Sequence, residues 1–327
     1  MLMIPIYCYD VPLLKYTTMS IFRFLCFFFI LVFPLHALQH AQDIGKYLIV
    51  GLNQFPISDK TVSFLNTYKI AGVIFMSDTY KHPRTVKTAI TTLKSKVNHS
   101  LLFCIDQEGG RVSRMKQPFF QLPAASELAL MDYYQVKALY QTHARELANI
   151  GITVNFSPVV DVNRNANNSV IGSRSYGSDP KHVAYLAQIA IQSYQEAGIL
   201  PVIKHFPGHG FTQEDSHIRL PEHKNPQHFR HVDLLPFETL ISSGAPAVMV
   251  NHIRYPFLDP IYPASLSSTI IGGLLQQQLH FDGLIFTDDL SMGAIRSLYS
   301  LKTSIKRAIE AGNDYLLVIE SHDKLRT

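Results

Sequence analysis

Short apolar runs alternate with amphipathic segments along the chain from residue 47 onward. The runs that predict strands are 47–52, 72–76, 101–105, 152–160, 200–204, 247–250, 283–287 and 315–319. Between them, apolar residues recur at helical spacing and predict helices over 83–97, 128–149, 180–197, 232–243, 269–279 and 303–311. The apolarity within each strand is continuous and does not alternate with polar positions, which is typical of parallel strands buried on both faces.

Eight strand–helix units within about 280 residues predict a single α/β domain with the architecture of a (β/α)8 TIM barrel. A doubly wound open sheet is the alternative. It is disfavoured because polar residues follow many of the strands, whereas an open sheet concentrates them at one or two switch points. The chain ends soon after the eighth strand, at Thr327, so we expect a short or truncated C-terminal helix.

Polar and charged side chains stand where the predicted strands end. They are Asp106, Asp161, Lys204-His205, Asn251-His252 and Asp288-Asp289. In a barrel of parallel strands the carboxyl ends converge on one face, and the active sites of such barrels lie on that face. The pattern therefore predicts one site that is built from several distant segments of the chain.

An apolar run precedes the predicted domain. Residues 24–33 are all apolar and follow Arg23, and together with Pro34 and Leu35 they match a signal-peptide core in length. Small residues suited to cleavage follow at Ala37 and Ala41. We expect residues 1–41 to hold an upstream extension, with Met19 as the start, and a signal peptide or, alternatively, an uncleaved anchor. Such a leader predicts export to the periplasm or cell envelope; without a functional leader the chain would be cytoplasmic.

Composition and charge limit the partners that we expect. Hydrophobic residues make up 47% of the chain and charged residues 17%, which suits a large buried core. The net charge is only +4 and no block of five or six basic residues occurs, so nucleic-acid binding is disfavoured. We expect a monomer that contacts a membrane only through an uncleaved leader. Beyond the leader, Cys104 is the one cysteine, which excludes an intrachain disulfide in the mature chain.

The densest group of titratable residues follows the fifth predicted strand. Lys204, His205, His209, Asp215 and His217 lie there, among glycine and proline residues that exclude a continuous helix or strand. One interpretation is a metal site, since His and Asp suit zinc or iron, although the helical His-x-x-x-His spacing is absent. Another is general acid–base chemistry, because Asp215 can raise the pKa of His217 and fix its tautomer. Polar groups that merely satisfy the backbone are a third interpretation, disfavoured by this density.

Carboxylates and arginines near other strand ends have both structural and functional interpretations. Asp288 can be a nucleophile or an ion-pair anchor, and Asp289 can cap the helix that follows; both can also be caps. Asp106 can accept hydrogen bonds from sugar hydroxyls or form a structural ion pair with an arginine such as Arg114. Arg174 is flanked by glycine and serine residues that would let it fold over the mouth of the barrel, although a lone arginine is usually solvated.

Seven motifs, taken in order, resemble those of glycoside hydrolase family 3, specifically its single-domain β-N-acetylhexosaminidases of peptidoglycan recycling. The resemblance covers roughly residues 44–320. The motifs are Asp106–Arg114 (DQEGGRVSR), Leu122–Ala125 (LPAA), Asn155–Val162 (NFSPVVDV), Ile171–Tyr176 (IGSRSY), Lys204–Gly210 (KHFPGHG), Asp215–His217 (DSH) and Phe281–Met292 (FDGLIFTDDLSM). Residues 42–327 are accordingly identified as a catalytic (β/α)8 domain of this family.

The resemblance implies a retaining, two-step mechanism without a metal or a cofactor. Asp288 matches the family's nucleophile, which forms a covalent glycosyl-enzyme. His217 matches the acid/base of this subfamily, and Asp215 matches the residue that orients it. The positions that match the family's sugar-binding residues are Asp106, Arg114, Arg174, Lys204 and His205. The implied activity is removal of terminal non-reducing β-linked N-acetylglucosamine from peptidoglycan fragments or chitin oligosaccharides.

Two other functions are compatible with the same motifs. A histidine acid/base leaves room for an anionic acceptor, where a carboxylate would repel phosphate, so a β-N-acetylglucosaminide phosphorylase is one alternative. An inactive sugar-binding barrel at the cell envelope is the other, and it is disfavoured because every catalytic position of the family pattern is filled. The predicted export signal departs from the cytoplasmic location that is typical of the recycling enzymes.

Overall fold

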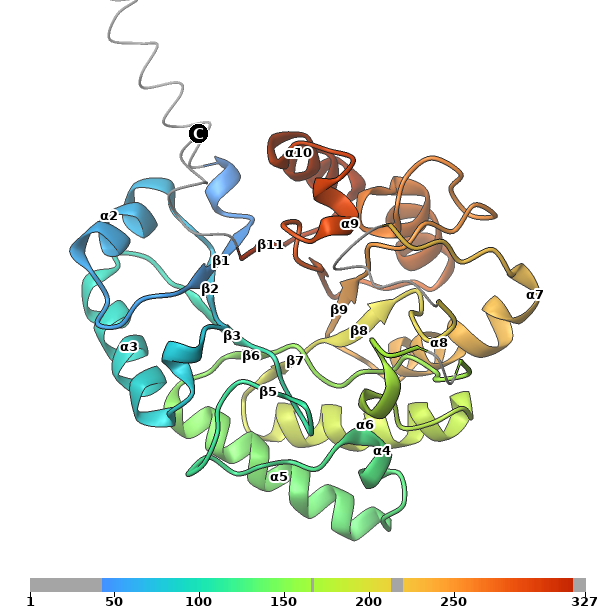
Figure 1. Ribbon diagram of the computed structural model, residues 1–327, viewed down its shortest axis with the longest axis horizontal. Coiled ribbons are helices and arrows are strands. Elements are labelled where there is room, and N and C mark those ends of the chain that lie inside the picture. Colours follow the sequence, from blue (N-terminus) through green and yellow to red (C-terminus); the bar gives the residue numbers. More distant parts are fainter. Residues whose placement is uncertain (1–42, 166–167, 213–219, 320–327) are drawn as a thin grey trace, which may run out of the picture. The chain divides into compact units, whose positions relative to one another are not determined.

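The computed structural model describes residues 43–165, 168–212 and 220–319, and these form an α/β domain with parallel sheets (Figure 1). One sheet has the strand order β11-β1-β2-β3-β6-β7 and another has the order β10-β9-β8. The strands of the first are β1 Leu48–Leu52, β2 Gly72–Phe75, β3 Leu102–Ile105, β6 Val154–Asn155, β7 Leu200–Pro201 and β11 Leu316–Val318. Those of the second are β8 Ile203–Phe206, β9 Ala247–Val250 and β10 Leu284–Thr287. A small antiparallel pair, β4 Gln107–Gly109 with β5 Val112–Ser113, follows β3.

Parallel backbone bridges also connect strands of the two large sheets. Phe286 in β10 bridges to Tyr315, which directly precedes β11, and the Thr287 N–H donates to the Tyr315 carbonyl at 2.9 Å. Val159, beyond the end of β6, bridges to Lys204 in β8, and the Val160 N–H donates to the Lys204 carbonyl at 2.8 Å. The strand ends of the two sheets are therefore held in a common register, which matters for the site described below.

Helices surround the strands on the outside (Figure 1). The α-helices are α2 Asp59–Tyr68, α3 Pro83–Lys96, α4 Ala125–Leu128, α5 Tyr133–Ile150, α6 Pro180–Glu196, α7 Pro226–His228, α8 Leu235–Ser242, α9 Gly293–Arg296 and α10 Leu301–Ala311. The 3-10 helices are η1 Asp78–Tyr80, η2 Gly172–Arg174 and η4 Ala264–Leu266, and the π-helices are η3 Phe229–Asp233 and η5 Thr269–Gln278. No helix in these three described stretches has both the length and the apolar character that crossing a bilayer requires.

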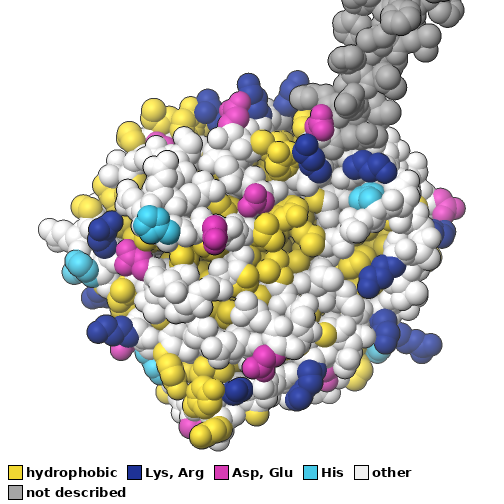
Figure 2. All heavy atoms as spheres, turned by 180° about the vertical axis from the view of Figure 1, so that it is seen from behind, with side chains coloured by type: hydrophobic (Ala, Val, Ile, Leu, Met, Phe, Trp, Pro, Cys, Tyr) yellow, Lys and Arg dark blue, Asp and Glu magenta, His cyan; other side chains and the backbone are white. Residues whose placement is uncertain are grey.

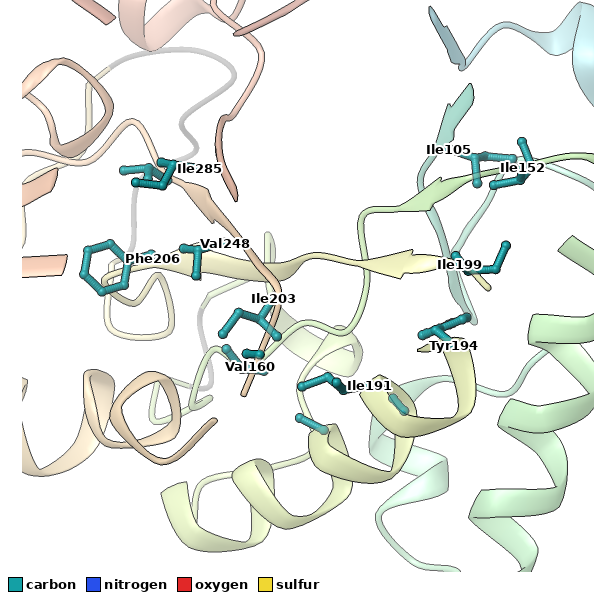
Figure 3. Close-up of a cluster of buried hydrophobic side chains, with 14 of the residues drawn as sticks. Ile105, Ile152, Val160, Ile191, Tyr194, Ile199, Ile203, Phe206, Val248 and Ile285 are labelled. Atoms are coloured by element: carbon teal, nitrogen blue, oxygen red, sulfur yellow. The ribbon is translucent and has the colours of Figure 1, made fainter. Parts of the chain in front are cut away.

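Successive residues of each strand belong to different parts of the core. In β1, Val50 packs in the large cluster between the strands and the helices, whereas Ile49 belongs to a smaller cluster. The smaller cluster takes residues from every predicted strand: Ile49, Ile74, Cys104, Val154, Phe156, Val202, Ala247, Met249, Phe286 and Leu317. Figure 3 shows part of the large cluster, where Ile203 and Val160 lie next to Ile191 of α6. Burial on both faces explains why the strands are apolar without alternation.

Several predicted boundaries need correction. The fourth strand stops at Asn155 and not at residue 160, because the Ser157 N–H donates back to the Asn155 carbonyl and Pro158 has no N–H. The fifth strand is divided at Val202 into β7 and β8. The prediction of eight strand segments is otherwise confirmed, although helix α2 was not predicted.

Two predicted helices also differ in detail. A capping box between Asp132 and Gln135 starts α5 at Tyr133, so the predicted helix from residue 128 is divided into α4 and α5. The segment predicted as a helix over 269–279 is the π-helix η5, in which the Leu279 N–H donates to the Leu274 carbonyl five residues earlier. The adjacent Gly272 and Gly273 lie inside it and weaken the preference for regular α-helix. The predicted C-terminal helix and the leader lie outside the described residues.

Charged side chains do not gather by sign on the face that Figure 2 draws. Lysine and arginine side chains are interspersed there with aspartate and glutamate side chains. A nucleic-acid-binding surface would instead place a basic patch or stripe on one face. The face that Figure 2 draws carries no such patch.

The contact between α5 and α6 contains a buried histidine, His143, whose charge state makes a testable prediction. Its Nδ1 lies 3.1 Å from the Tyr194 hydroxyl, and its ring meets Phe119 edge-on. Burial lowers the pKa of His143 from 6.5 to about 3. Below pH 6.5 the unfolded chain therefore binds a proton that the folded chain does not bind, and stability is lost as the pH falls toward 3.

We expect this group alone to lower the free energy of unfolding by about 2 kcal/mol between pH 7 and pH 5. Denaturant unfolding at both pH values, compared between the wild type and His143→Phe, measures the difference. The variant should lose less stability on acidification than the wild type. His231→Gln, which removes an exposed histidine, is the matched control. An equal loss in the wild type and in His143→Phe would contradict the assignment.

Candidate active site

A pocket of about 540 Å³ opens where the strands end, and its lining comes from loops far apart in the sequence. Its charged and titratable lining residues are Asp106, Glu108, Arg111, Arg114, Arg174, Lys204, His205, His209, Asp288 and Asp289. Its apolar lining residues include Met76, Met249 and Met292, together with Leu317 and Ile319. We call the three methionines the pocket methionines. A pocket with apolar residues and several convergent polar groups is typical of a ligand site.

Asp106, directly after β3, is held by two cations. Its Oδ1 lies 2.6 Å from Lys204 Nζ, and its Oδ2 lies 3.6 Å from Arg114 Nη2. Lys204 comes from β8, so this ion pair joins the end of one strand to the next sheet. The Arg114 Nε is buried and has no hydrogen-bond partner among the described residues. Part of the donor capacity of Arg114 is therefore available to a ligand.

Glu108, in β4, forms ion pairs with two cations of the pocket. Both carboxylate oxygens bind Arg174, with Oε2 at 2.8 Å from Nε and Oε1 at 2.8 Å from Nη2. The same Oε1 lies 2.7 Å from Lys204 Nζ. Burial alone would raise the pKa of Glu108, but the adjacent guanidinium and ammonium charges hold it well below its usual range. Glu108 is therefore a permanent negative charge between two cations.

His205 is fixed in orientation by a buried aspartate. Its Nδ1 lies 2.6 Å from Asp161 Oδ2, while Arg174 Nη2 lies 3.3 Å from its Nε2. Since the guanidinium can only donate, Nε2 accepts and the ring carries its proton on Nδ1. Asp161 also accepts the backbone N–H of His209 at 2.7 Å. Burial opposes ionisation of Asp161, but His205 and the His209 N–H lower its pKa below the usual value.

The chain after β8 approaches its neighbours too closely for side chains at two positions. Gly208 has φ of +132°, and a Cβ on Gly210 would lie 1.9 Å from the Val162 carbonyl oxygen. Beyond them, the Thr212 hydroxyl lies 3.0 Å from His209 Nδ1, and Asn168 Nδ2 donates to the His209 carbonyl at 2.9 Å. The start of the loop is thus fixed against the segment that leads to Arg174.

Asp288 follows β10 and faces the pocket as an ionised carboxylate. Burial alone would raise its pKa, but His252, His205, the Asp289 N–H and the Lys204 ammonium together lower it to about 2. The Asp289 N–H donates to Asp288 Oδ1 at 2.8 Å, and this contact orients the carboxylate. At neutral pH an anion is therefore held beside the cations of the pocket, with the oxygen lone pairs that a nucleophile needs.

The neighbouring Asp289 has a different environment. Its Oδ1 accepts the Ser291 N–H at 2.9 Å and the Ile319 N–H at 3.1 Å, and its carbonyl oxygen accepts the Met292 N–H. Burial raises the pKa of Asp289 above its usual value. These contacts are those of a cap on a turn, as one interpretation of the sequence expected, although the helix α9 that follows begins only at Gly293.

His252, after β9, supports the backbone beside Asp288. Its Nε2 lies 2.9 Å from the Asp289 carbonyl oxygen and its Nδ1 lies 2.7 Å from Ser265 Oγ. The carbonyl can only accept, so Nε2 carries a proton and donates it. Burial lowers the pKa of His252 below its usual value. His252 is therefore a fixed support for the turn that carries the two aspartates.

The pocket brings together six of the eight site residues expected from the sequence. Asp106, Arg114, Arg174, Lys204, His205 and Asp288 all line it. The other two, Asp215 and His217, lie in 213–219, outside the described residues. Among the described residues, those of the pocket included, no cluster of three or more His, Cys, Asp or Glu side chains is placed to hold a metal ion.

Sequence reasoning missed the parts of the site that act through other residues. Glu108 was not selected, although it stands two positions after Asp106 in the same motif. Asp161 and His252 were noted only as strand-end residues without a role. The spacing of Asp106 and Glu108 was a usable signal, because residues two apart in an extended strand point to the same side.

Comparison with known proteins places this chain in a family. Residues 42–326 match the glycosyl hydrolase family 3 N-terminal domain. A β-hexosaminidase of Hydrogenovibrio crunogenus is 37% identical over 260 residues, which are 76% of this chain and 71% of that protein. A β-hexosaminidase of Pseudomonas aeruginosa is 35% identical over 255 residues, 76% of this chain and 75% of that protein.

Solved structures agree with these relatives. A family 3 β-N-acetylglucosaminidase from Paenibacillus sp. superposes with a TM-score of 0.84 at 34% identity; the match covers 88% of this chain and 56% of that chain. NagZ from Neisseria gonorrhoeae, solved with N-trifluoroacetyl-D-glucosamine, superposes with a TM-score of 0.78 at 31% identity, over 86% and 83% of the two chains. The fold, the motifs and these matches agree, and the chain belongs to glycosyl hydrolase family 3.

Proposed function

We propose that the protein is a retaining β-N-acetylhexosaminidase that removes terminal non-reducing β-linked N-acetylglucosamine. The observation that carries this proposal is Asp288, an ionised carboxylate oriented by a backbone N–H at the edge of a pocket rich in hydrogen-bond donors. The names of the relatives, β-hexosaminidase and β-N-acetylglucosaminidase, support the sugar. Peptidoglycan fragments and chitin oligosaccharides are the substrate classes that we propose.

In the first step, an Asp288 oxygen attacks the anomeric carbon as the bond to the leaving oxygen breaks. A covalent glycosyl-enzyme forms and the charge of the carboxylate is consumed. The surroundings of Asp288 lower its pKa to about 2. The carboxylate is therefore ionised and available for attack at any pH above about 4. The nearby Lys204 ammonium also stabilises the carboxylate when it is released in the second step.

We assign the proton transfers to His217, with Asp215 as the residue that orients it. His217 would protonate the leaving oxygen in the first step. It would then take a proton from the water that attacks the glycosyl-enzyme and restores free Asp288. This assignment rests on the motif Asp215–His217, which follows the described residues His209 and Thr212 within a few positions.

The charged residues that line the pocket are suited to hold the hydroxyls and the acetamido group of one sugar. Asp106 accepts hydrogen bonds, whereas Lys204, Arg114 and Arg174 donate them. His205 adds an oriented imidazole. The pocket methionines are suited to contact the apolar face of the ring, since thioethers adapt to irregular surfaces. One sugar bound in this pocket would present its anomeric carbon to Asp288.

We further propose that the strands form the closed (β/α)8 barrel that the sequence predicts. The bridges Phe286–Tyr315 and Val159–Lys204 support closure, since each joins a strand of one sheet to a strand of the other. The small core cluster supports it too, because it takes side chains from all eight strand segments, as a filled barrel interior would.

Export to the cell envelope remains a prediction from the sequence, because the apolar run precedes the described residues. Mass spectrometry of the mature N-terminus would test it. A chain that begins after residue 41 is the expected result, and a chain that retains residues 24–33 would contradict cleavage.

The two adjacent aspartates give the sharpest test of the nucleophile. Asp288→Asn keeps the size of the side chain but removes the attacking anion, so we expect hydrolysis of 4-nitrophenyl β-N-acetylglucosaminide to fall by roughly a thousandfold or more. Asp289→Asn is the matched control, one position away, and should mainly lower the melting temperature because it weakens a cap. Comparable activity in Asp288→Asn and the wild type would exclude Asp288 as the nucleophile.

The acid–base role of His217 predicts a dependence on the leaving group. His217→Ala should slow the release of an alkyl alcohol or a second sugar by about 100-fold or more, because such leaving groups need a proton. Release of 4-nitrophenolate should slow much less in the first step, since this group leaves without protonation. Steady-state rates on a series of leaving groups give the comparison. A parallel loss across the whole series would assign His217 a structural role instead.

A further inference from the structure

We propose that Glu108 is a built-in counter-ion that makes the pocket selective for a neutral sugar over an anionic ligand. By neutralising Arg174 and Lys204, it would let both side chains donate hydrogen bonds to hydroxyl and carbonyl oxygens without attracting anions. Glu108 is thus a specificity-determining residue in addition to the residues that contact the sugar. The identity of the neutral ligand rests on the proposed function, whereas the exclusion of anions does not.

The geometry gives Glu108 contact with both cations at once. Its carboxylate binds Arg174 through two bonds of 2.8 Å and Lys204 through one of 2.7 Å. The exposed fractions of the side chains are 6% for Glu108, 12% for Arg174 and 3% for Lys204. Water therefore screens these charges weakly, and each cation depends on a nearby carboxylate for compensation.

The charges around the pocket balance only when Glu108 is included. Four cations line it, namely Arg111, Arg114, Arg174 and Lys204, and four carboxylates line it, namely Asp106, Glu108, Asp288 and Asp289. Asp106 is shared between Lys204 and the more distant Arg114, so it cannot neutralise both of them together with Arg174. Removal of the Glu108 charge would leave an excess cation in a weakly screened site.

Neutralisation does not use up the donors. Asp106 and Glu108 take two of the three Lys204 N–H groups. Contacts with Glu108, His205 and Val170 take four of the five Arg174 N–H groups. Counted within the described part of the chain, one donor remains on each side chain. A hydroxyl or an amide carbonyl can accept from these donors, but an anion gains little from a neutral cluster.

A purely structural role for Glu108 predicts something else. If the carboxylate only held Arg174 and Lys204 in place, its loss would weaken every ligand, charged or neutral. If it sets the charge of the pocket, its loss would weaken neutral sugars but strengthen anions. The change in anion affinity therefore separates the two roles, because only a change in charge can increase it.

Glu108→Gln, which keeps the shape and removes the charge, is the decisive variant. Sulfate is the probe, because phosphate could also serve as an acceptor in the reaction. We expect calorimetry at constant ionic strength to show sulfate binding that is about tenfold tighter, or more, than in the wild type. Asp59→Asn is the matched control, since it removes one carboxylate from an exposed ion pair with Lys96 and should leave sulfate affinity unchanged.

Two further variants separate charge from shape. Glu108→Gln combined with Arg174→Gln removes one charge of each sign, so its sulfate affinity should return to the weak wild-type value. Glu108→Asp keeps the charge but shortens the side chain, so it should weaken N-acetylglucosamine binding without a gain for sulfate. A gain in either variant, or unchanged affinity in folded Glu108→Gln, would overturn the proposal.

The test remains decisive if Glu108→Gln does not fold. Sulfate binding by Glu108→Asp and by the wild type then provides the test, because the proposal requires weak sulfate binding in both proteins. Tight sulfate binding by the wild type would overturn it directly. Calorimetry measures binding and needs no turnover. If the protein cleaved no β-N-acetylglucosaminide, the proposed function would be refuted, but the comparison of sulfate affinities would still be valid.

Discussion

Burial of the parallel strands on both faces is the constraint on which the rest of this structure depends. Neither face has room for an unpaired charge, so charged residues in or directly after the strands are paired with one another. Lys204 illustrates the result: it lies within the fully buried strand β8, and its ammonium is placed between the carboxylates of Asp106 and Glu108. The density of the pocket thus follows from the apolar core beneath it.

The fold could be predicted as far as apolar runs determine it. Continuous runs such as 47–52 and 247–250 became strands close to the predicted bounds. The remaining details depend on local hydrogen bonds that compete with regular structure. Ser157 and Pro158 end a strand that hydropathy alone would extend. The Gly272-Gly273 pair lies in the π-helix η5, whose apolar residues are spaced along the sequence in a way that also predicts an α-helix.

Residues of the site could be predicted where the residue that lines the pocket also stands at the end of an apolar run. Asp106, Lys204 and Asp288 are charged residues at the ends of apolar runs, and all three line the pocket. Glu108 is different, because its role depends on Arg174, which lies 66 positions further along the chain. No local pattern specifies that partner, since the fold alone brings the two segments together. Residues that contact a ligand are thus easier to find from sequence than residues that tune those contacts.

Asp161 links two tasks that are usually regarded as separable. The same carboxylate holds the His205 ring and the backbone N–H of His209, from which the loop toward Asp215 begins. Redesign of His205 for another sugar would therefore also disturb the start of that loop. The pocket methionines make no such link, because thioethers take little part in hydrogen-bond networks. Evolution of a new sugar preference would accordingly have more freedom at the methionine positions of the pocket than at its charged positions.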